Sequence, residues 1–231
     1  MLNQERYLVI IPAYNEEATI REVVNRAQVY ADVCVIDDCS QDRTGEILDS
    51  IENIHVIRHE KNTHIPGVVL DGMRYAVDKD YDYAITMDAG LSHDPDELSR
   101  FISNPPTDLI IGTRITKKGT PLFRRVLSKM ANLAYNCALD FPANTIKPIQ
   151  YNDLTSGYRR YSNRAMRLII SRKIESKSFD ILFETTMFIY NNGLTISEVP
   201  VSYTFSNSSL NRRVVQDCIM MCMKSVINPR K

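Results

Sequence analysis

The 231-residue sequence predicts an α/β fold with a central, mostly parallel sheet, and three observations support this class. Short apolar runs of strand length alternate with segments whose apolar residues recur at helical spacing. The runs at 7–11 and 33–36 are apolar throughout, as in strands covered on both faces. Acidic residues directly follow several runs, at the strand ends where open α/β sheets bind ligands. This alternation predicts a doubly wound sheet with right-handed crossovers.

The first half of the chain supplies five of the expected strands, at 7–11, 33–36, 54–57, 83–87 and 108–114. A helix after the first strand has Asn15 as its expected cap and a buried stripe of Ile20, Val23, Val24 and Ala27. The next helix turns Ile47, Leu48 and Ile51 inward, and a third covers about 67–78. Another opens at Pro95, since proline suits a first helical position.

The second half opens with a long amphipathic helix at 121–140. Its apolar stripe consists of Leu122, Val126, Leu133, Ala134 and Cys137, with Arg124, Arg125 and Lys129 elsewhere on the helix. Packing against a core is the more common use of such a stripe, but basic residues beside it also suit an anionic membrane surface.

The remaining elements are two helices, an edge strand and a C-terminal helix. The helices cover about 163–171 and 180–192, and Gly193 ends the second. Residues 195–203 alternate like a strand, and Pro200 places that strand at a sheet edge. The C-terminal helix, at about 212–227, is a second candidate for membrane contact through Ile219, Met220, Met221 and Met223.

Composition restricts the function classes. A hydrophobic fraction of 44% and a charged fraction of 24% are ordinary for a soluble globular protein, and a net charge of zero gives no indication of nucleic-acid binding. Five cysteines form no paired framework, which fits reduced thiols in a cytosol. Neither a signal peptide nor an apolar run of about 20 residues is evident. We therefore expect a cytoplasmic protein whose membrane contact, if any, is peripheral, at the cytoplasmic face.

Acidic residues gather where the expected strands end: Glu16 and Glu17, Asp37 and Asp38, and Asp88. Converging carboxylates are costly unless they meet a cation or hydrogen-bond donors. A nucleotide base, a ribose or a metal-bound diphosphate would supply these. The alternative is that the same residues only cap turns and helices.

Five motifs resemble family 2 glycosyltransferases of the GT-A type, in order and spacing. Three are Pro12-Ala-Tyr-Asn-Glu-Glu17, Val35-Ile-Asp-Asp-Cys-Ser-Gln-Asp-Arg-Thr44 and Met87-Asp-Ala-Gly-Leu-Ser-His-Asp-Pro95. Two more, Asp153-Leu-Thr-Ser-Gly-Tyr-Arg159 and Ile196-Ser-Glu-Val-Pro200, resemble the branch containing dolichol- or polyprenol-phosphate mannose synthases. The resemblance covers 7 to about 213. It implies one Rossmann-like nucleotide-diphospho-sugar transferase domain, with 1–115 binding the nucleotide-sugar and 116–231 the acceptor.

The resemblance also implies roles for individual residues. Asp37, with Asp38 beside it, would hold the base, and the nucleotide would be bordered by Pro12, Ala13, Tyr14 and Glu16. Asp88 would face ribose, metal and diphosphate, as the first acid of an Asp-x-Asp signature, and Arg114 would face the phosphates. The acceptor side would be lined by Ser156, Gly157 and Arg159. Glu198 also matches a family position, although a strand glutamate is more often structural.

The sequence departs from the family pattern at positions that bear on metal binding and on membership of the mannose-synthase branch. Gly90 replaces the second acid of Asp-x-Asp, and Ser92 stands where the polyprenol enzymes usually have Gln. Mg²⁺ or Mn²⁺ could still bind through Asp88, since such cations take their other oxygen ligands from substrate phosphates and water. We expect the neighbouring His93 to form hydrogen bonds rather than ligate metal. The loops at 62–67 and 206–213 depart from the mannose synthases, which bears on that branch more than on the family.

The implied reaction is an inverting transfer from a GDP- or UDP-sugar to a polyprenyl phosphate. A lipid phosphate is already anionic at neutral pH and needs no base, whereas a sugar hydroxyl does. One alternative is therefore transfer to a hydroxyl of a surface polysaccharide or lipid-linked glycan, with Asp153 as base, although Asp153 could equally cap the Thr155-Ser156 turn. A second alternative, prompted by Gly90, is a degenerate domain that binds a nucleotide without catalysis.

Overall fold

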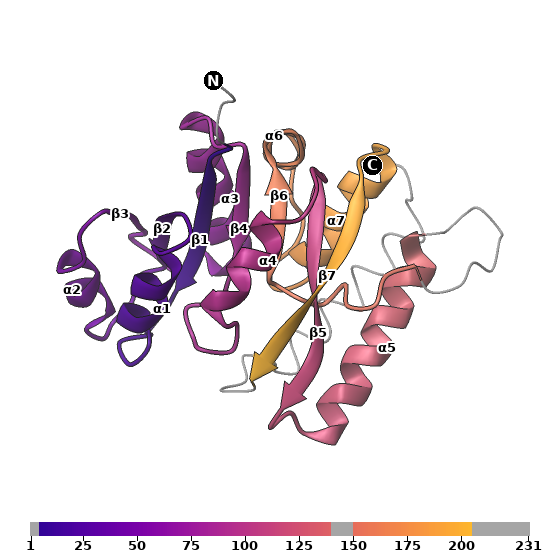
Figure 1. Ribbon diagram of the computed structural model, residues 1–231, viewed down its shortest axis with the longest axis horizontal. Helices are drawn as coiled ribbons and strands as arrows, with labels where there is room; N and C mark the ends of the chain where they lie inside the picture. The colour runs from indigo at the N-terminus through magenta and orange to yellow at the C-terminus, as the bar shows by residue number, and fades with distance from the viewer. Residues whose placement is uncertain (1–4, 140–149, 205–231) are drawn as a thin grey trace.

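Residues 5–139 and 150–204 are described by the computed structural model, which forms one seven-stranded sheet with helices on both faces (Figure 1). The strand order is β3-β2-β1-β4-β6-β5-β7. The strands are β1 (Tyr7–Ala13), β2 (Asp32–Asp37), β3 (Ile54–Arg58), β4 (Tyr83–Thr86), β5 (Leu109–Lys118), β6 (Arg159–Ser162) and β7 (Ile196–Thr204). The helices are α1 (Ile20–Ala27), α2 (Thr44–Asp49), α3 (His64–Asp78), α4 (Leu98–Ile102), α5 (Leu122–Leu139), α6 (Asn163–Ile170) and α7 (Ile181–Asn191), with a 3₁₀ turn η1 (Pro95–Glu97).

The sheet is mixed rather than wholly parallel. Strands β1 to β4 pair in parallel, as the alternation of strand and helix predicts. Strand β6 is inserted antiparallel between β4 and β5, and β7 returns parallel to β5 at the edge. Pro200 lies on this edge strand, where its missing N–H removes no bond from an interior ladder.

Successive residues of the first strands face opposite cores, which confirms that these strands are covered on both faces. Leu8 and Ile10 of β1 join a cluster with α3, α6 and α7. Val9 and Ile11 join a second cluster with α1 and α4. The predicted stripe of α1 is buried completely, at Ile20, Val23, Val24 and Ala27.

Local signals at element ends are partly confirmed. Pro95 opens η1 and Gly193 follows α7 with a φ of 67°, as expected. The expected Asn15 cap is wrong, because α1 begins at Ile20 after Thr19 and has no side-chain cap bond. Asn15 instead has a φ of 56°, and its Oδ1 accepts a 2.7 Å hydrogen bond from the backbone N–H of Gln41. Its amide therefore joins the turns after β1 and β2.

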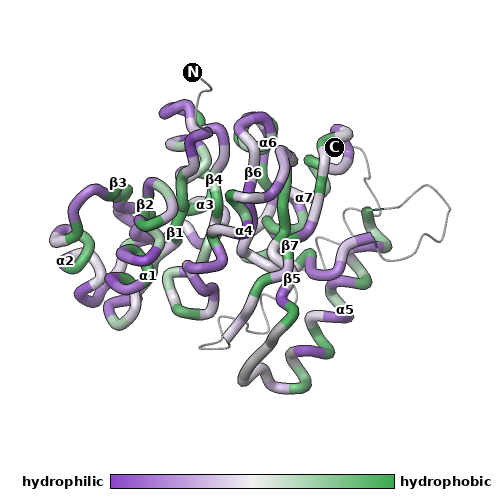
Figure 2. Tube along the Cα trace, viewed as in Figure 1, coloured by the Kyte–Doolittle hydropathy of each residue, from purple (hydrophilic) through white to green (hydrophobic). Residues whose placement is uncertain are grey.

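Helix α5 is present, but its apolar stripe does not pack on the core. Leu122, Val126 and Leu133 are each at least half exposed, as are Phe123 and Met130. The opposite side of the helix is buried and includes Asn132, Asn136 and Tyr135. Figure 2 shows apolar segments along α5 although the helix lies at the edge of the molecule. The predicted stripe therefore does not face the core, and α5 packs there through Tyr135, Ala138 and Leu139 instead.

None of the helices within the described residues is both long and apolar enough to cross a bilayer. The expected C-terminal helix at 212–227, with Cys218 and Cys222, lies outside those residues. The three cysteines within them, Cys34, Cys39 and Cys137, are free thiols.

Candidate active site

The carboxyl ends of β1, β2 and β4 form one edge of the sheet. Ala13 pairs with Asp37 in register, and the N–H of Asp38 donates to the carbonyl of Ala13 at 2.9 Å. On the other side of β1, the N–H of Met87 donates to the carbonyl of Ile10 at 3.1 Å, which delivers Asp88 to the same edge. The predicted convergence of these strand ends is therefore present.

The two aspartates after β2 have different surroundings, although both are buried. Asp37 accepts from the N–H of Ser40 at 3.0 Å, and its other oxygen lies 3.8 Å from Nε of Arg58. Asp38 accepts from Thr63 and the N–H of His64, and lies 2.7 Å from Nδ1 of His59. The carboxylate of Asp38 thus holds the segment that opens α3, and its contacts lie within the chain.

The turn after β1 brings Tyr14 and Glu16 to this edge. Tyr14 is 49% exposed, whereas Pro12 and Ala13 lie within β1. The N–H of Glu16 donates to Thr44, and its carboxylate accepts from Thr19 at 3.0 Å. Burial raises the pKa of Glu16, the Thr19 bond opposes this, and the charge of Asp88 raises the pKa further. Glu16 and Asp88 therefore sense each other's charge.

Asp88 is exposed and lies beside a buried histidine. Its N–H donates to Nδ1 of His93 at 3.2 Å, so that nitrogen carries no proton of its own. Burial lowers the pKa of His93, and its ring stacks on Tyr158 at 4.8 Å between centroids. A neutral imidazole adds no positive charge beside Asp88, whose carboxylate stays available to a ligand. His93 thus forms hydrogen bonds, as expected.

Gly157 closes the other side of this carboxylate. A Cβ at Gly157 would stand 3.8 Å from Oδ1 of Asp88 and 3.9 Å from Cε1 of His93. The carbonyl of Gly157 accepts from the hydroxyl of Thr86 at 2.7 Å, which ties the motif to β4.

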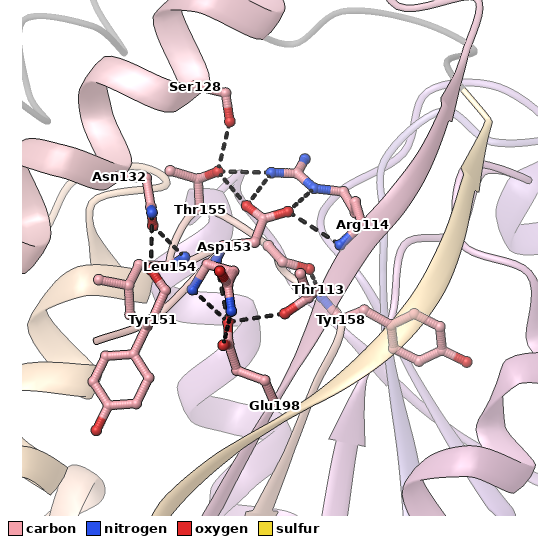
Figure 3. A network of polar contacts seen from close by, with 12 residues as sticks. Thr113, Arg114, Ser128, Asn132, Tyr151, Asp153, Leu154, Thr155, Tyr158 and Glu198 are labelled. Atoms are coloured by element: carbon pink, nitrogen blue, oxygen red, sulfur yellow. Dashed lines mark hydrogen bonds and ion pairs between the residues drawn. The ribbon is translucent and has the colours of Figure 1, made fainter. Parts of the chain in front are cut away.

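Arg114 and Asp153 form a bidentate ion pair (Figure 3). Nε of Arg114 donates to Oδ2 and Nη2 to Oδ1, both at 2.6 Å, and Nη2 also donates to Thr155. The Asp153 side chain is only 3% exposed. Burial lowers the pKa of Arg114, but the bonds and charge of Asp153, with Tyr203 and Asp88, raise it overall. A carboxylate paired in this way is a poor proton acceptor.

The remaining residues expected on the acceptor side are interior. Ser156 and Arg159 have no exposed surface. The guanidinium of Arg159 donates to the carbonyls of Leu154, Ser156 and Leu182 and to the hydroxyl of Thr186, at 2.6–3.0 Å. Arg159 therefore joins β6 to α7, and of the three expected residues only Gly157 lies against Asp88.

Several residues that build the site have no binding or catalytic role predicted from the sequence. Tyr203 places its ring 5.2 Å from the guanidinium carbon of Arg114, and Thr155 and Ser128 continue the polar network. Ser128, Asn132 and Asn136 recur every fourth residue along the helix, and this regularity is visible in the sequence. Among the described residues, no three His, Cys, Asp or Glu side chains are grouped to hold a metal ion.

This sheet edge, with its carboxylates and buried arginine, belongs to a fold shared with the GT-A glycosyltransferases. The glucosyl-3-phosphoglycerate synthase of Mycobacterium tuberculosis, solved with Mn²⁺, UDP-glucose and phosphoglyceric acid, matches with a TM-score of 0.73. The match covers 96% of this chain and 80% of that chain, at 13% identity. Staphylococcus aureus TarS matches with a TM-score of 0.60 at 17% identity, covering 95% and 71% of the two chains.

Sequence comparison identifies the family. The family model described as glycosyl transferase family 2 matches residues 8–174, so the chain belongs to that family and is a glycosyltransferase. A polyprenol monophosphomannose synthase of Mycolicibacterium smegmatis is 32% identical, covering 87% of this chain and 78% of the relative. An undecaprenyl-phosphate mannosyltransferase of Micrococcus luteus is 31% identical, covering 86% and 83%. A UDP-N-acetylglucosamine–dolichyl-phosphate N-acetylglucosaminyltransferase of Methanococcus voltae is 28% identical, covering 88% of both.

Proposed function

We propose that this glycosyltransferase moves a sugar from a nucleotide-sugar to a polyprenyl phosphate, with inversion at the anomeric carbon. The three relatives named above act on polyprenol, undecaprenyl or dolichyl phosphates by their names, and they span most of the chain. They differ in the sugar they carry, so the proposal names the acceptor class and leaves the donor as a GDP- or UDP-sugar.

The state of Asp153 is the observation that carries the choice of acceptor. A sugar hydroxyl must lose a proton to a base within hydrogen-bond reach as it attacks. Asp153 was the candidate base, but both its oxygens accept from Arg114 and its side chain is buried. A lipid phosphate, with a second pKa of about 6, is anionic at neutral pH and attacks without such a base.

The donor would lie along the edge formed by β1, β2 and β4. Its base would meet Asp37, and its nucleoside would pass Tyr14, whose exposed ring offers a stacking surface. Pro12, Ala13 and Glu16 would border it. Asp38 would act indirectly, by holding the 59–64 segment. Residues 1–115 would thus bind the donor and 116–231 the acceptor.

The residues at Asp88 fit a divalent cation that takes most of its oxygens from the substrate. Asp88 is exposed, and its charge adds to burial in raising the pKa of the nearby Glu16. One carboxylate suits Mg²⁺ or Mn²⁺, since such ions keep waters and bind substrate phosphates. A bound cation would neutralise charge on the diphosphate as it leaves.

The protein's own contribution to the departure of the diphosphate would come from Arg114. Its Nε and Nη2 are committed to Asp153 and Thr155, which fixes the plane of the guanidinium. Nη1 is not part of the pair with Asp153 and would face the phosphates. A preoriented cation stabilises charge that develops in the transition state more than charge in the ground state.

Helix α5 would bring the enzyme to the membrane that holds the acceptor. Its exposed apolar side chains, with exposed Arg125 and Lys129 on the same helix, form a surface suited to an anionic bilayer. We expect flotation with liposomes that contain anionic lipid. Replacing Met130 and Leu133 together by Ser should leave the protein in the soluble fraction, and flotation unchanged by this substitution would contradict α5 docking.

The function is tested by matched acceptors. The protein is incubated with UDP- or GDP-sugars, Mg²⁺ or Mn²⁺, and liposomes that carry either polyprenyl phosphate or the corresponding polyprenol. We expect release of nucleoside diphosphate with the phosphate only. Comparable release with polyprenol or a glycan would favour a hydroxyl acceptor. Nucleotide binding without release from any pair would instead indicate a non-catalytic domain.

A further inference from the structure

The buried side of α5 carries three uncharged polar residues at four-residue intervals: Ser128, Asn132 and Asn136. This spacing places them on one face of the helix. All three form hydrogen bonds with the segment 150–155, which contains Asp153. The polar face of α5 therefore lies against the segment that holds Arg114.

The two asparagines bind the backbone of this segment. Oδ1 of Asn132 accepts from the N–H of Leu154 at 2.8 Å, and Nδ2 donates to the carbonyl of Tyr151 at 2.9 Å. Asn136 accepts from the N–H groups of Gln150 and Tyr151, both at 3.0 Å. Because a buried backbone group without a partner is costly, these bonds fix where the segment runs.

Ser128 completes the network at Thr155. The two hydroxyls are 3.0 Å apart, Thr155 donates to Oδ1 of Asp153 at 2.9 Å, and Nη2 of Arg114 donates to Thr155 at 2.6 Å. A hydroxyl has one proton to donate and two lone pairs to accept with. Since Thr155 gives its proton to Asp153, the proton between the hydroxyls comes from Ser128.

Glu198 of β7 holds the segment from the other side. Its carboxylate accepts from the N–H groups of Asn152 and Asp153 and from the amide of Asn152, at 2.7–3.2 Å. The segment is therefore held from both sides, and its two side chains that bind Arg114 have little freedom (Figure 3).

We propose that Ser128 and Asn132 are positioning residues for Arg114, acting through Thr155 and the backbone of Leu154. The inference rests on the proposed role of Arg114 at the donor phosphates. Small errors in the orientation of a planar guanidinium weaken its contact with phosphate, because its donors point in fixed directions. Neither residue needs to touch a substrate for its loss to slow the reaction.

A double-mutant cycle between Ser128 and Arg114 tests the proposal. Ser128→Ala should lower kcat about fivefold, the usual worth of one hydrogen bond, and Ser128→Thr should restore it. Alanine is the better helix former, so folding is not at risk. In an Arg114→Lys background, Ser128→Ala should change kcat by less than about twofold, because the group that it positions is gone. Asn132→Ala should behave likewise, with a loss of about tenfold.

Ser171→Ala, which removes an exposed hydroxyl after α6, is the matched control and should leave kcat and the melting temperature unchanged. A second readout is the NMR signal of the Arg114 Nε–H, assigned by its loss in Arg114→Lys. Its exchange with solvent should be faster in Ser128→Ala. An unchanged kcat in Ser128→Ala, or an equal loss in both backgrounds, would overturn the proposal.

Failure of the proposed function would look different. If no polyprenyl phosphate supports turnover, the same cycle is measured on the dissociation constant of UDP or GDP by calorimetry. A dissociation constant unchanged in Arg114→Lys would refute the role of Arg114 at the phosphates. One that rises in Arg114→Lys but not in Ser128→Ala would refute the positioning role alone.

Discussion

Helices α1 and α5 carry the same kind of apolar repeat and use it in opposite ways. In α1 the repeat is buried completely against the sheet, whereas in α5 it is exposed and the polar face is buried. The residues opposite the stripe distinguish the two helices. Those of α1 include Arg21, Glu22 and Arg26, whose charges require water. Those of α5 include an alcohol and two amides, whose hydrogen bonds a neighbouring segment can satisfy, beside the buried ring of Tyr135.

The difference shows that apolar spacing identifies the apolar face of a helix but does not say whether that face packs on the core or faces solvent. An amphipathic helix can bury either side, provided that every buried polar group finds a partner. For α5 those partners come from residues 150–155. This segment lies outside the stretch whose apolar spacing predicts the helix. The four predictions below test how far the polar interior of the second half differs from the apolar interior of the first.

The largest effect is expected at Arg159, a fully buried arginine of the second half. Arg159→Leu should lower the free energy of unfolding by about 4 kcal/mol, because the carbonyls that it satisfies lose their donor inside the protein. Chemical denaturation measures this loss. A variant of normal stability with a raised KM for the acceptor would instead support the role at the acceptor side that the family resemblance implies.

Asp153→Asn should follow, with a loss of about 3 kcal/mol in unfolding free energy, because it leaves Arg114 without its charge partner in a mostly buried site. We also expect kcat to fall, since the guanidinium loses its fixed orientation. Denaturation and nucleoside diphosphate release on the same preparation measure the two effects. Loss of turnover at full stability would contradict this account and restore Asp153 as a candidate base.

Asp88→Asn should affect activity and not stability. The exposed carboxylate lies 3.5 Å from Nδ1 of His93, a nitrogen that carries no proton to donate, so the melting temperature should stay nearly constant. We expect kcat to fall about a hundredfold, equivalent to about 2.7 kcal/mol in the barrier, as the site loses its charge for a cation. Titration with Mn²⁺ in the presence of nucleoside diphosphate should show weaker binding. Full activity of Asp88→Asn would contradict a role of Asp88 in the reaction.

The smallest effect is expected on the outer face of α5, compared with α1 by the same kind of truncation. Val24→Ala should cost about 2 kcal/mol of unfolding free energy, since it opens a cavity in the core. Met130→Ala, at an exposed position, should cost less than about 0.5 kcal/mol. Denaturation curves of the two variants measure these losses. Equal losses of unfolding free energy would mean that the exposed face of α5 is covered by another part of the protein.

Much of the fold was predictable because its signals are local. The strands around β1 are short apolar runs, and the stripe of α1, the start at Pro95 and the stop at Gly193 all follow from neighbouring residues. The family and the edge that gathers Asp37 and Asp88 were predictable from motifs. The insertion of β6 antiparallel was not, since it depends on how distant strands pair.

The functional state of individual side chains was less predictable. Asp153 and Arg159 sit in one motif, yet one clamps Arg114 and the other joins β6 to α7. Arg114 lies 39 residues from Asp153, and the α7 carbonyl that Arg159 binds, that of Leu182, lies 23 residues away, so no local spacing indicates these two contacts. The Asn15 cap failed for a similar reason, because its partner Gln41 belongs to another turn.

The position of β6 has a consequence for the modularity of this enzyme. Strand β5 belongs in sequence largely to the half assigned to the donor, yet its only ladder neighbours in the described chain are β6 and β7, which come later. A fragment cut near residue 115 would leave β5 with no strand to pair with. A chimera of two relatives joined near residue 115 would therefore have to pair β5 of one protein with β6 and β7 of the other, so the two proposed halves are not separate folding units.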